Sequence, residues 1–221
     1  MNHVIVIPAI NAGNLAGCLD SMDPTVRARV LVVDNTPDRT CSPAGQPVAA
    51  AGKNLGVAAS WNLGCRDAFG GGADFVTVCS SSMRFDPDGG VALTATADFC
   101  TAHRQWLWGF ESLNGWHLFT VGRLTWERIG EFDERFWPAY FEDNDYIWRM
   151  RCAGILPPAG PHTPDRKIPW VPWLNYRCVG DAQAVKSGAV TIDLAALEAV
   201  YVEKWGGPPG HELWAAAYGA Q

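Results

Sequence analysis

The sequence predicts an α/β fold with a mostly parallel sheet. Three short apolar segments, residues 3–10, 28–37 and 74–79, have the composition of buried strands. Segments with helical periodicity separate them, so the chain alternates between strand and helix. This order requires crossover connections, which are right-handed in nearly all proteins and place the strands parallel in one sheet.

The first strand–helix unit is clearly marked. "HVIVIPAI" is a β-branched run that ends near Pro8, as a buried parallel strand does. The next segment, "NLAGCLDSM", predicts a helix with one apolar face, and Asn11 or Asn14 can cap its start. The residues of that face are Leu15, Cys18, Leu19 and Met22.

The helix between the second and third strands is predicted over residues 55–69. Val57, Trp61 and Cys65 lie on one face, and the glycines at 70–72 end the helix.

The remaining elements follow a less regular pattern. They are a glycine-weakened helix at 87–100, a strand at 115–123, a short helix at 124–130, a helix at 141–155, a proline-rich loop or sheet edge at 156–173 and an amphipathic helix at 193–207. The 141–155 segment starts acidic and ends basic, which complements the helix dipole. Asp193 can cap the last helix, and Gly206 can stop it.

The composition is that of an ordinary soluble globular protein, with 221 residues, 48% hydrophobic and 18% charged. The net charge of -6 attracts neither nucleic acid nor anionic lipid, so nucleic acid is disfavoured as a partner unless a local basic groove exists. Neither a run of about 20 apolar residues nor a signal peptide occurs, which predicts a cytoplasmic protein without a membrane partner. The 7 cysteines form no C-x-x-C pair, so neither a zinc site nor a disulfide framework is predicted.

Polar residues gather where the predicted strands end. In open parallel sheets, ligands bind beyond the carboxyl ends of the strands. Residues 9–11, 34–36 and 80–82 occupy those ends. We therefore expect them to face one crevice and to form a ligand site.

Four segments, in order, resemble the family 2 type of glycosyltransferases: "VIVIPAINAGNLAGCLDSM", "VLVVDNTP", "KNLGVAASWNLG" and "GEFDERFWPAYFEDNDYIWRMRCAG". The resemblance implies a GT-A fold, which is a Rossmann-like, mostly parallel sheet flanked by helices with a smaller mixed acceptor-side region. We expect one domain over residues 1–221, with a nucleotide-sugar half at 1–100 and an acceptor half at 101–221. The implied activity is inverting sugar transfer from a nucleotide-diphosphate sugar, with a UDP-sugar favoured, to a hydroxyl of a soluble protein, glycan or modified nucleobase.

The resemblance also implies a set of donor-binding residues. They are Pro8, Ala9, Ile10, Asn11, Asp34, Asn35, Lys53, Asn54, Gly56, Asn62, Ser80, Ser81 and Ser82. Residues 8–11 would line the base, with Ala9 and Ile10 in place of the usual threonine and aromatic residue. Asp34 would accept a hydrogen bond from a base N–H, because a carboxylate only accepts. Without the family, Asp34-Asn35 also fits an ordinary turn, and Asn54 an ordinary helix cap.

The Glu142-Asp143 pair is expected to supply the general base. Inverting transfer needs a group that takes the acceptor's hydroxyl proton as the oxygen attacks the anomeric carbon. The resemblance assigns this role to Asp143, with Glu142 and Asp145 as further catalytic candidates. The three carboxylates repel one another, which can raise a pKa. Arg149 would hold one of these acids or pair with the leaving diphosphate. The alternative interpretation of the three carboxylates is an ordinary solvated helix start, which the helix dipole favours.

The serines at 80–82 stand where that family has an Asp-x-Asp-like motif whose last acid holds a divalent metal, Mn²⁺ or Mg²⁺, on the diphosphate. Three explanations stay open. In the first, the enzyme works without a metal and holds the diphosphate with serine hydroxyls, Lys53 or Arg84. In the second, it holds a metal weakly through the donor phosphates and acids such as Asp143. In the third, the protein binds a sugar nucleotide without catalysis. No metal ligand is assigned. The other side chains that could stand in for the missing ligands are Asp86, Asp88, His162 and Asp181.

Tryptophan is unusually frequent, with 11 in the chain. Trp fills cores and also forms platforms for sugar rings. The candidates for the acceptor wall are Trp106, Trp108, Trp116, Trp137 and Phe141. A nucleotidyltransferase of related fold is a weaker alternative, because "PAINAGN" lacks the glycine-rich, basic first turn that triphosphate chemistry would need.

Overall fold

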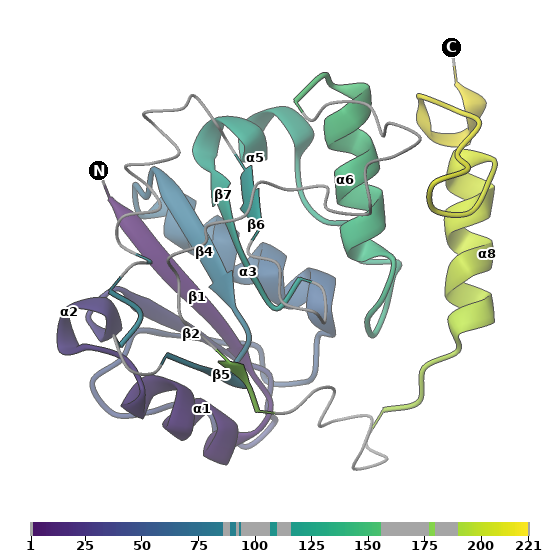
Figure 1. Cartoon of the computed structure of the whole chain (residues 1–221). Coiled ribbons are helices and arrows are strands. Elements are labelled where there is room, and N and C mark those ends of the chain that lie inside the picture. Colours follow the sequence, from purple (N-terminus) through teal and green to yellow (C-terminus); the bar gives the residue numbers. More distant parts are fainter. Residues whose placement is uncertain are drawn as a thin grey trace.

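The computed structural model of the chain describes residues 2–85, 89–91, 93, 107–109, 116–155, 177–179 and 190–220. In this part of the chain, the central element is a 6-stranded sheet with the order β3-β2-β1-β4-β7-β6 (Figure 1). The strands are β1 (His3–Ala9), β2 (Val30–Asp34), β3 (Val48–Ala50), β4 (Phe75–Cys79), β6 (Leu107–Gly109) and β7 (Leu118–Gly122). Strands β1 to β4 are parallel, and β7 is antiparallel to both β4 and β6. The predicted mostly parallel sheet is confirmed.

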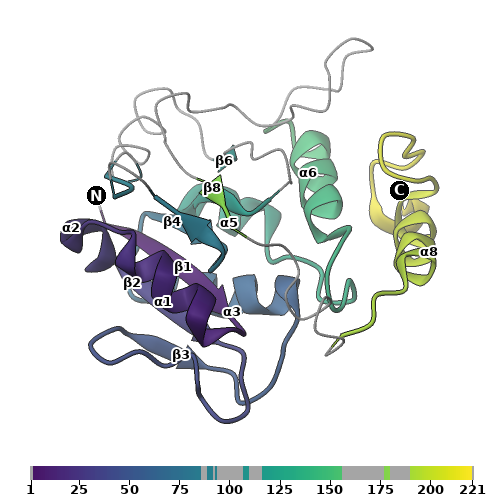
Figure 2. The ribbon, with the colours of Figure 1, turned by 60° about the horizontal axis from the view of Figure 1, so that its bottom comes forward.

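Helices cover both faces of this sheet. They are α1 (Ala12–Asp20), α2 (Pro24–Arg27), α3 (Val57–Gly70), α5 (Arg123–Ile129), α6 (Glu142–Cys152) and α8 (Leu194–Trp205), with a 3-10 turn at Ala217–Gly219. The view in Figure 2 shows α1 in front of the sheet and α3 behind it. A second, two-stranded sheet pairs β5 (Met83–Arg84) with β8 (Arg177–Cys178).

The alternation of side chains along β1 builds two cores. Ile5 and Ile7 are fully buried in the cluster on the α1 side, together with Leu15 of α1. Val6 points to the opposite face and packs in the cluster that contains Trp61 of α3. Because both faces are covered, β1, β2 and β4 are mostly apolar, and this is why they could be predicted as apolar runs.

Gly64 sets how closely α3 approaches the sheet. A Cβ at this position would lie 2.2 Å from Cγ1 of Val6 and 3.0 Å from Cγ2 of Val33. The helix therefore lies against the strands at a distance that only glycine allows.

The predicted caps are largely confirmed. Asn11 caps α1, since its side chain accepts from the backbone N–H of Asn14. Asp193 caps α8, and Gly206 ends it in the left-handed conformation with φ 78°. Helix α3 begins at Val57 rather than at residue 55, because Gly56 has φ 79° and lies outside helical geometry.

Several predicted segments lie outside the described residues, and one strand in the structure was not predicted. The predicted helix at 87–100 and the proline-rich segment at 156–173 lie mainly or wholly outside the described residues, as do Asp86, Asp88, Trp106, His162 and Asp181. Trp108 lies on β6. The short strand β3 was not predicted, because three residues of Val-Ala-Ala carry no recognisable strand pattern.

Helix α8 packs beside α6 at one side of the molecule (Figure 1). Its residues Leu197, Tyr201 and Trp205 form a third apolar cluster with Phe136, and Phe141 packs against it. Among the described helices, none has the length and apolar character that a membrane crossing needs.

Candidate functional site

The carboxyl ends of β1 and β2 lie side by side. Ala9 pairs with Asp34 in the parallel register, and the backbone N–H of Asn35 donates to the carbonyl of Ala9 at 2.9 Å. Strand β4 flanks β1 on its other side and leads into Ser80. We call this edge, with the start of α3, the donor edge. At its rim Ile10 and Asn11 are exposed and Pro8 is half-buried.

Asp34 is fully buried, and its carboxylate holds the loop that follows β2. One oxygen accepts from the backbone N–H and hydroxyl of Thr36, at 2.9 and 2.5 Å. The other accepts from the hydroxyl of Ser42 at 2.6 Å, and the backbone of Cys41 also donates to the carboxylate. Burial raises the pKa of Asp34, but these hydrogen bonds outweigh burial and the net pKa is lowered. In this arrangement both carboxylate oxygens already accept hydrogen bonds from the protein's own 36–42 loop.

Asn35 and Asn54 organise the start of α3. The side-chain oxygen of Asn35 accepts from the hydroxyl of Ser60 at 3.0 Å and from the backbone N–H of Leu55 at 3.4 Å. The side-chain oxygen of Asn54 accepts from the backbone N–H of Gly56 at 2.9 Å. Lys53, just before this cap, is exposed at the donor edge. A cation beside a helix start suits an anionic ligand.

Asn62 lies away from the donor edge in the α3 interior. It is fully buried, and its amide donates to the carbonyl of Phe132 at 2.9 Å and accepts from the same residue's N–H at 2.9 Å. It also donates to Glu134 at 2.9 Å. Asn62 therefore ties α3 to the loop that leads to α6.

The serine segment forms a tight turn after β4. The hydroxyls of Ser80 and Ser82 are 2.8 Å apart and hydrogen-bonded, and that of Ser82 also contacts the thiol of Cys178 at 3.3 Å. Arg84 donates to the carbonyls of Ser81 and Met83 at 3.3 and 2.7 Å. The hydroxyls and the guanidinium are thus already engaged within the turn.

The described residues do not fit a divalent cation held by protein side chains. Within them, no group of three or more His, Cys, Asp or Glu side chains could hold a metal ion. Neutral hydroxyls that bond to one another supply no charge to replace the missing carboxylates.

The acidic residues at 142–145 form the first turn of α6, which we call the acidic turn. Asp143 is half-buried there, and its Oδ1 accepts from the backbone N–H of Asn144 at 2.8 Å. Glu142 is buried, and its Oε2 has no hydrogen-bond partner among the described residues. Burial and the adjacent Asp143 carboxylate raise the pKa of Glu142 to about 8, so Glu142 is mostly protonated at neutral pH.

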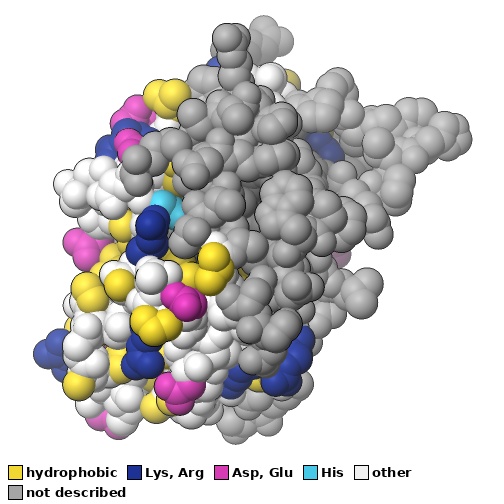
Figure 3. All heavy atoms as spheres, turned by 60° about the vertical axis from the view of Figure 1, so that its left-hand side comes forward, with side chains coloured by type: hydrophobic (Ala, Val, Ile, Leu, Met, Phe, Trp, Pro, Cys, Tyr) yellow, Lys and Arg dark blue, Asp and Glu magenta, His cyan; other side chains and the backbone are white. Residues whose placement is uncertain are grey.

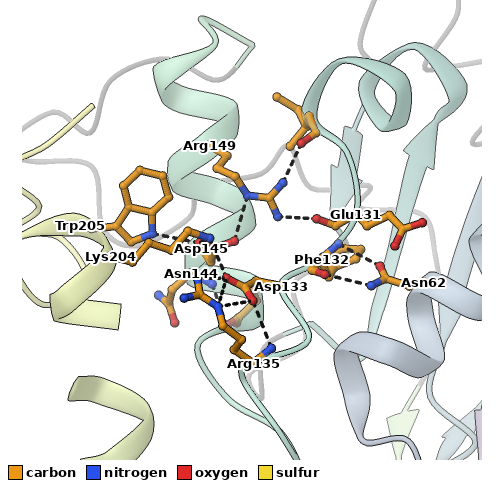
Figure 4. A network of polar contacts seen from close by, with 12 residues as sticks. Asn62, Glu131, Phe132, Asp133, Arg135, Asn144, Asp145, Arg149, Lys204 and Trp205 are labelled. Carbon is orange, nitrogen blue, oxygen red and sulfur yellow. Dashed lines mark hydrogen bonds and ion pairs between the residues drawn. The ribbon is translucent and has the colours of Figure 1, made fainter. Parts of the chain in front are cut away.

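Asp145 is the buried anchor of the acidic turn (Figure 4). Its carboxylate accepts from Nε of Arg149 at 2.9 Å and from the indole N–H of Trp205 at 2.9 Å, and it pairs with Lys204 at 2.5 Å. Arg149 also donates to the carbonyls of Ile129 and Glu131 at 2.7 and 2.8 Å. The expected pairing of Arg149 with one of the acids is present, and Asp145 is the residue it holds.

The acceptor candidates differ in their exposure. Trp137 is 53% exposed, and Phe141 is half-buried against Tyr201 with ring centroids 5.8 Å apart. Trp116 packs into the aromatic cluster around Trp61 and Phe119 and belongs mainly to the core. Tyr140 was not predicted; it is 48% exposed and precedes the acidic turn.

The donor edge and the segment before the acidic turn are in direct contact. The backbone N–H of Val57 donates to the carbonyl of Pro138 at 2.8 Å. A Cβ on Gly56 would lie 2.7 Å from the ring of Trp137 and 2.8 Å from that carbonyl. The Trp137-Pro138 peptide is cis. The acidic turn therefore begins only a few residues from the start of α3, at the same end of the sheet (Figure 1).

Two residues of this region escaped the sequence analysis. Asp133 and Lys204 lie 71 positions apart in the chain, and their side chains form an ion pair at 2.8 Å. Hydrogen bonds from Arg135 and Lys204 outweigh the effect of burial and lower the pKa of Asp133 well below its usual range. The only sequence signal for Asp133 was its position inside the fourth resembling segment.

The surface carries charges of both signs. On the face drawn in Figure 3, described Lys and Arg side chains are interspersed with Asp and Glu side chains and form no continuous basic stripe.

No protein-family model matches the chain. Over 36 residues it is 50% identical to a galactofuranosyl glycosyltransferase of Leishmania donovani. This match covers 16% of the chain and only 8% of that protein.

Solved structures resemble a larger part of the chain. A mannosyltransferase from Pyrobaculum calidifontis, in complex with GDP-Man and Mn²⁺, matches 69% of this chain and 52% of its own, with a TM-score of 0.53 and 14% identity. The glucosyl-3-phosphoglycerate synthase from Mycobacterium tuberculosis, with Mn²⁺, UDP and phosphoglyceric acid, matches 70% of this chain and 66% of its own, with a TM-score of 0.52 and 14% identity. The chain thus spans between half and two thirds of these enzymes. It shares with them the GT-A glycosyltransferase fold, a mixed α/β architecture on a mostly parallel sheet.

Proposed function

We propose that this protein transfers a sugar from a nucleotide-diphosphate sugar to an acceptor hydroxyl, with inversion and with Asp143 as the general base. The observation that carries the proposal is the position of Asp143. It is half-buried in the acidic turn, and the preceding segment packs on the start of α3 at the donor edge. The fold shared with two sugar transferases, whose structures hold GDP-Man or UDP, supports the same reaction class.

The reaction balances with one carboxylate. The acceptor's hydroxyl proton moves to Asp143 as its oxygen forms a bond to the anomeric carbon. The bond from that carbon to the diphosphate oxygen breaks, and the nucleoside diphosphate leaves with the electron pair. Attack from the face opposite the leaving group inverts the anomeric configuration.

The neighbours of Asp143 are less suited to act as the base. Glu142 has its pKa raised to about 8 and holds its own proton at neutral pH. Asp145 is fully buried and satisfied by Arg149, Trp205 and Lys204. Asp143 is the acid of this turn that is partly exposed and lies near the donor edge.

The residues that would bind donor and acceptor follow from their exposure and their place beside the acidic turn and the donor edge. Lys53, Ile10 and Asn11 are exposed at the donor edge and would contact the diphosphate and the base. Trp137, exposed beside the acidic turn, would form the acceptor wall. The serine turn contains no carboxylate, so no step of this mechanism is routed through a metal.

Donor turnover is the direct test. The protein is incubated with UDP-, GDP- and dTDP-sugars, with EDTA or with Mn²⁺, and the released nucleoside diphosphate is quantified. We expect release from one donor, and a loss of about 100-fold or more in Asp143→Asn, the range for removal of a general base. Asp20→Asn is the matched control, because Asp20 is an exposed acid that pairs with Arg27 at 3.5 Å.

Other outcomes would assign a different function. Saturable donor binding without release, also in the presence of candidate acceptor glycans, would identify a non-catalytic binding protein. The self-bonded serine turn is the observation that favours this second candidate. Release of pyrophosphate from a nucleoside triphosphate and a sugar phosphate would instead identify a nucleotidyltransferase.

A further inference from the structure

Helix α8 reaches the acidic turn through charged side chains (Figure 4). Lys204, in its last turn, is buried, yet its ammonium group pairs with Oδ2 of Asp133 at 2.8 Å and with Oδ1 of Asp145 at 2.5 Å. Trp205, the next residue, donates its indole N–H to Asp145 at 2.9 Å. Two consecutive residues of α8 thus hold a carboxylate that lies two positions after Asp143.

The start of α6 lacks the capping that would fix it locally. Its N-cap residue, Phe141, has φ 70°, and no side chain caps the helix. Tyr140 before it also has φ 81°. Left-handed geometry at two consecutive non-glycine residues is strained and persists only where the surroundings enforce it. Here the surroundings include α8, since Phe141 packs against Tyr201.

The buried charges depend on Lys204 for their balance. Among the described residues, Asp133 has one other cationic partner, Arg135, and Asp145 has one other, Arg149. Lys204 is the group that joins the two carboxylates. Removing one member of a buried charge network leaves uncompensated charge, which forces the remaining groups to move or to take up water.

We propose that Lys204, assisted by Trp205, is a positioning residue for sugar transfer, because it joins Asp133 to Asp145 and thereby fixes the acidic turn that carries Asp143. The inference rests on the proposed function for its catalytic consequence. Its structural part, that α8 holds the acidic turn, stands on the contacts alone. A misplacement of about 1 Å at a reacting group costs roughly 100-fold in rate, so a loosened turn lowers kcat even with Asp143 present.

The test compares Lys204→Met with Lys204→Arg. Methionine removes the charge with little change in length, whereas arginine keeps a cation between the two carboxylates. We expect Lys204→Met to lower kcat by about 10- to 100-fold, with the donor KM within about 2-fold of wild type. Lys204→Arg should recover most of the loss. A simple loss of donor binding would move KM instead.

Hydrogen exchange supplies a readout that does not need activity. In Lys204→Met, amide exchange in residues 140–147 should accelerate, while exchange in β1 and β4 stays as in wild type. Val26→Ala is the control for general destabilisation, because Val26 is fully buried in the α1-side core, in a different cluster from α8. It should lower the melting temperature without changing kcat below the transition or selectively accelerating exchange at 140–147.

The outcomes separate the two proposals. Unchanged exchange at 140–147 together with unchanged kcat in Lys204→Met would overturn the positioning role. If wild-type protein turns over no donor, the proposed function fails, and exchange alone decides whether Lys204 holds the acidic turn. If kcat falls equally in Lys204→Met and Lys204→Arg, the charge is not the cause and the inference is wrong.

Discussion

The donor edge and the acidic turn are built from contacts of different range. At the donor edge, Asp34 bonds to Thr36 and Ser42, which are 2 and 8 positions away. At the acidic turn, Asp145 bonds to Trp205, 60 positions away, and Lys204 bonds to Asp133, 71 positions away. The Asp34 carboxylate is thus held within one loop, whereas the acidic turn is held by residues far away in the chain.

This difference separates a locally stabilised region from one that depends on tertiary packing. The donor edge rests on a sheet buried on both faces, and Asp34 and Asn54 find hydrogen-bond partners within their own loop or helix start. The acidic turn has its charged partners on two helices, Arg149 on α6 and Lys204 on α8. A substitution of one charged partner there should therefore also weaken the interactions of the others, whereas a substitution at the donor edge should affect its own loop alone.

The largest expected effect is the loss of the anchor of the acidic turn. Asp145→Asn should lower the free energy of unfolding by about 3 kcal/mol, because Lys204 and Arg149 lose a buried partner charge. Urea denaturation measures the change. Asp20→Asn, at an exposed ion pair, should change it by less than about 0.5 kcal/mol. A loss below about 1 kcal/mol in Asp145→Asn would remove the contrast between the two regions.

The junction of the two regions should give the next largest effect. Gly56→Ala forces a Cβ to within 2.7 Å of Trp137 and 2.8 Å of the Pro138 carbonyl, at a residue with φ 79°. We expect a loss of about 2 kcal/mol. Gly70→Ala, at the other end of the same helix with open space around it, should be neutral or stabilising. Thermal unfolding of both variants compares them, and equal melting temperatures would contradict the close contact.

A smaller effect is expected at the donor edge itself. Ser42→Ala removes one hydrogen bond to the buried Asp34 carboxylate and should cost about 1.5 kcal/mol at pH 7. Because the pKa of Asp34 is lowered in the folded protein, this stabilisation is present above the unfolded pKa of 3.8 and is lost as pH falls through the folded value. The difference between wild type and Ser42→Ala should therefore shrink in acid. A difference that grows below pH 4 would contradict the hydrogen bond.

The effect expected at Glu142 depends on pH and has the opposite sign. Its pKa is raised from 4.5 to about 8, so the folded protein binds this proton more tightly and loses stability as pH rises between these values. Glu142→Gln removes the titration. Its stability relative to wild type should therefore rise as pH increases from 4 to 8 and should show no gain near pH 4, since glutamine keeps an unpartnered polar atom in the same place. Melting temperatures across this range provide the measurement.

The parts of the molecule that could be predicted from sequence follow the same division. Strands β1, β2 and β4 and the caps Asn11 and Asp193 depend on neighbouring residues, and their prediction is confirmed. At Asp34 the bond to the Thr36 backbone is the one an ordinary turn would make, whereas the bond from Ser42, eight positions on, follows no local sequence pattern.

Lys204 shows why the acidic turn was harder to predict. In the sequence it is a cation in the last turn of an amphipathic helix, which the helix dipole alone explains. Its two carboxylate partners become apparent only once α8 packs against α6. Asp143 was selected by its place in a resembling segment, and its catalytic role stays a prediction.

The late position of α8 in the chain has a consequence for biosynthesis. Translation proceeds from the N-terminus at about 5–20 residues per second, and folding of the emerging chain follows it. The strands and helices of the donor edge are complete by Cys79, whereas the ion pairs to Asp133 and Asp145 wait for Lys204. During synthesis, a nascent chain can therefore assemble its donor edge well before its acidic turn acquires all its charged partners.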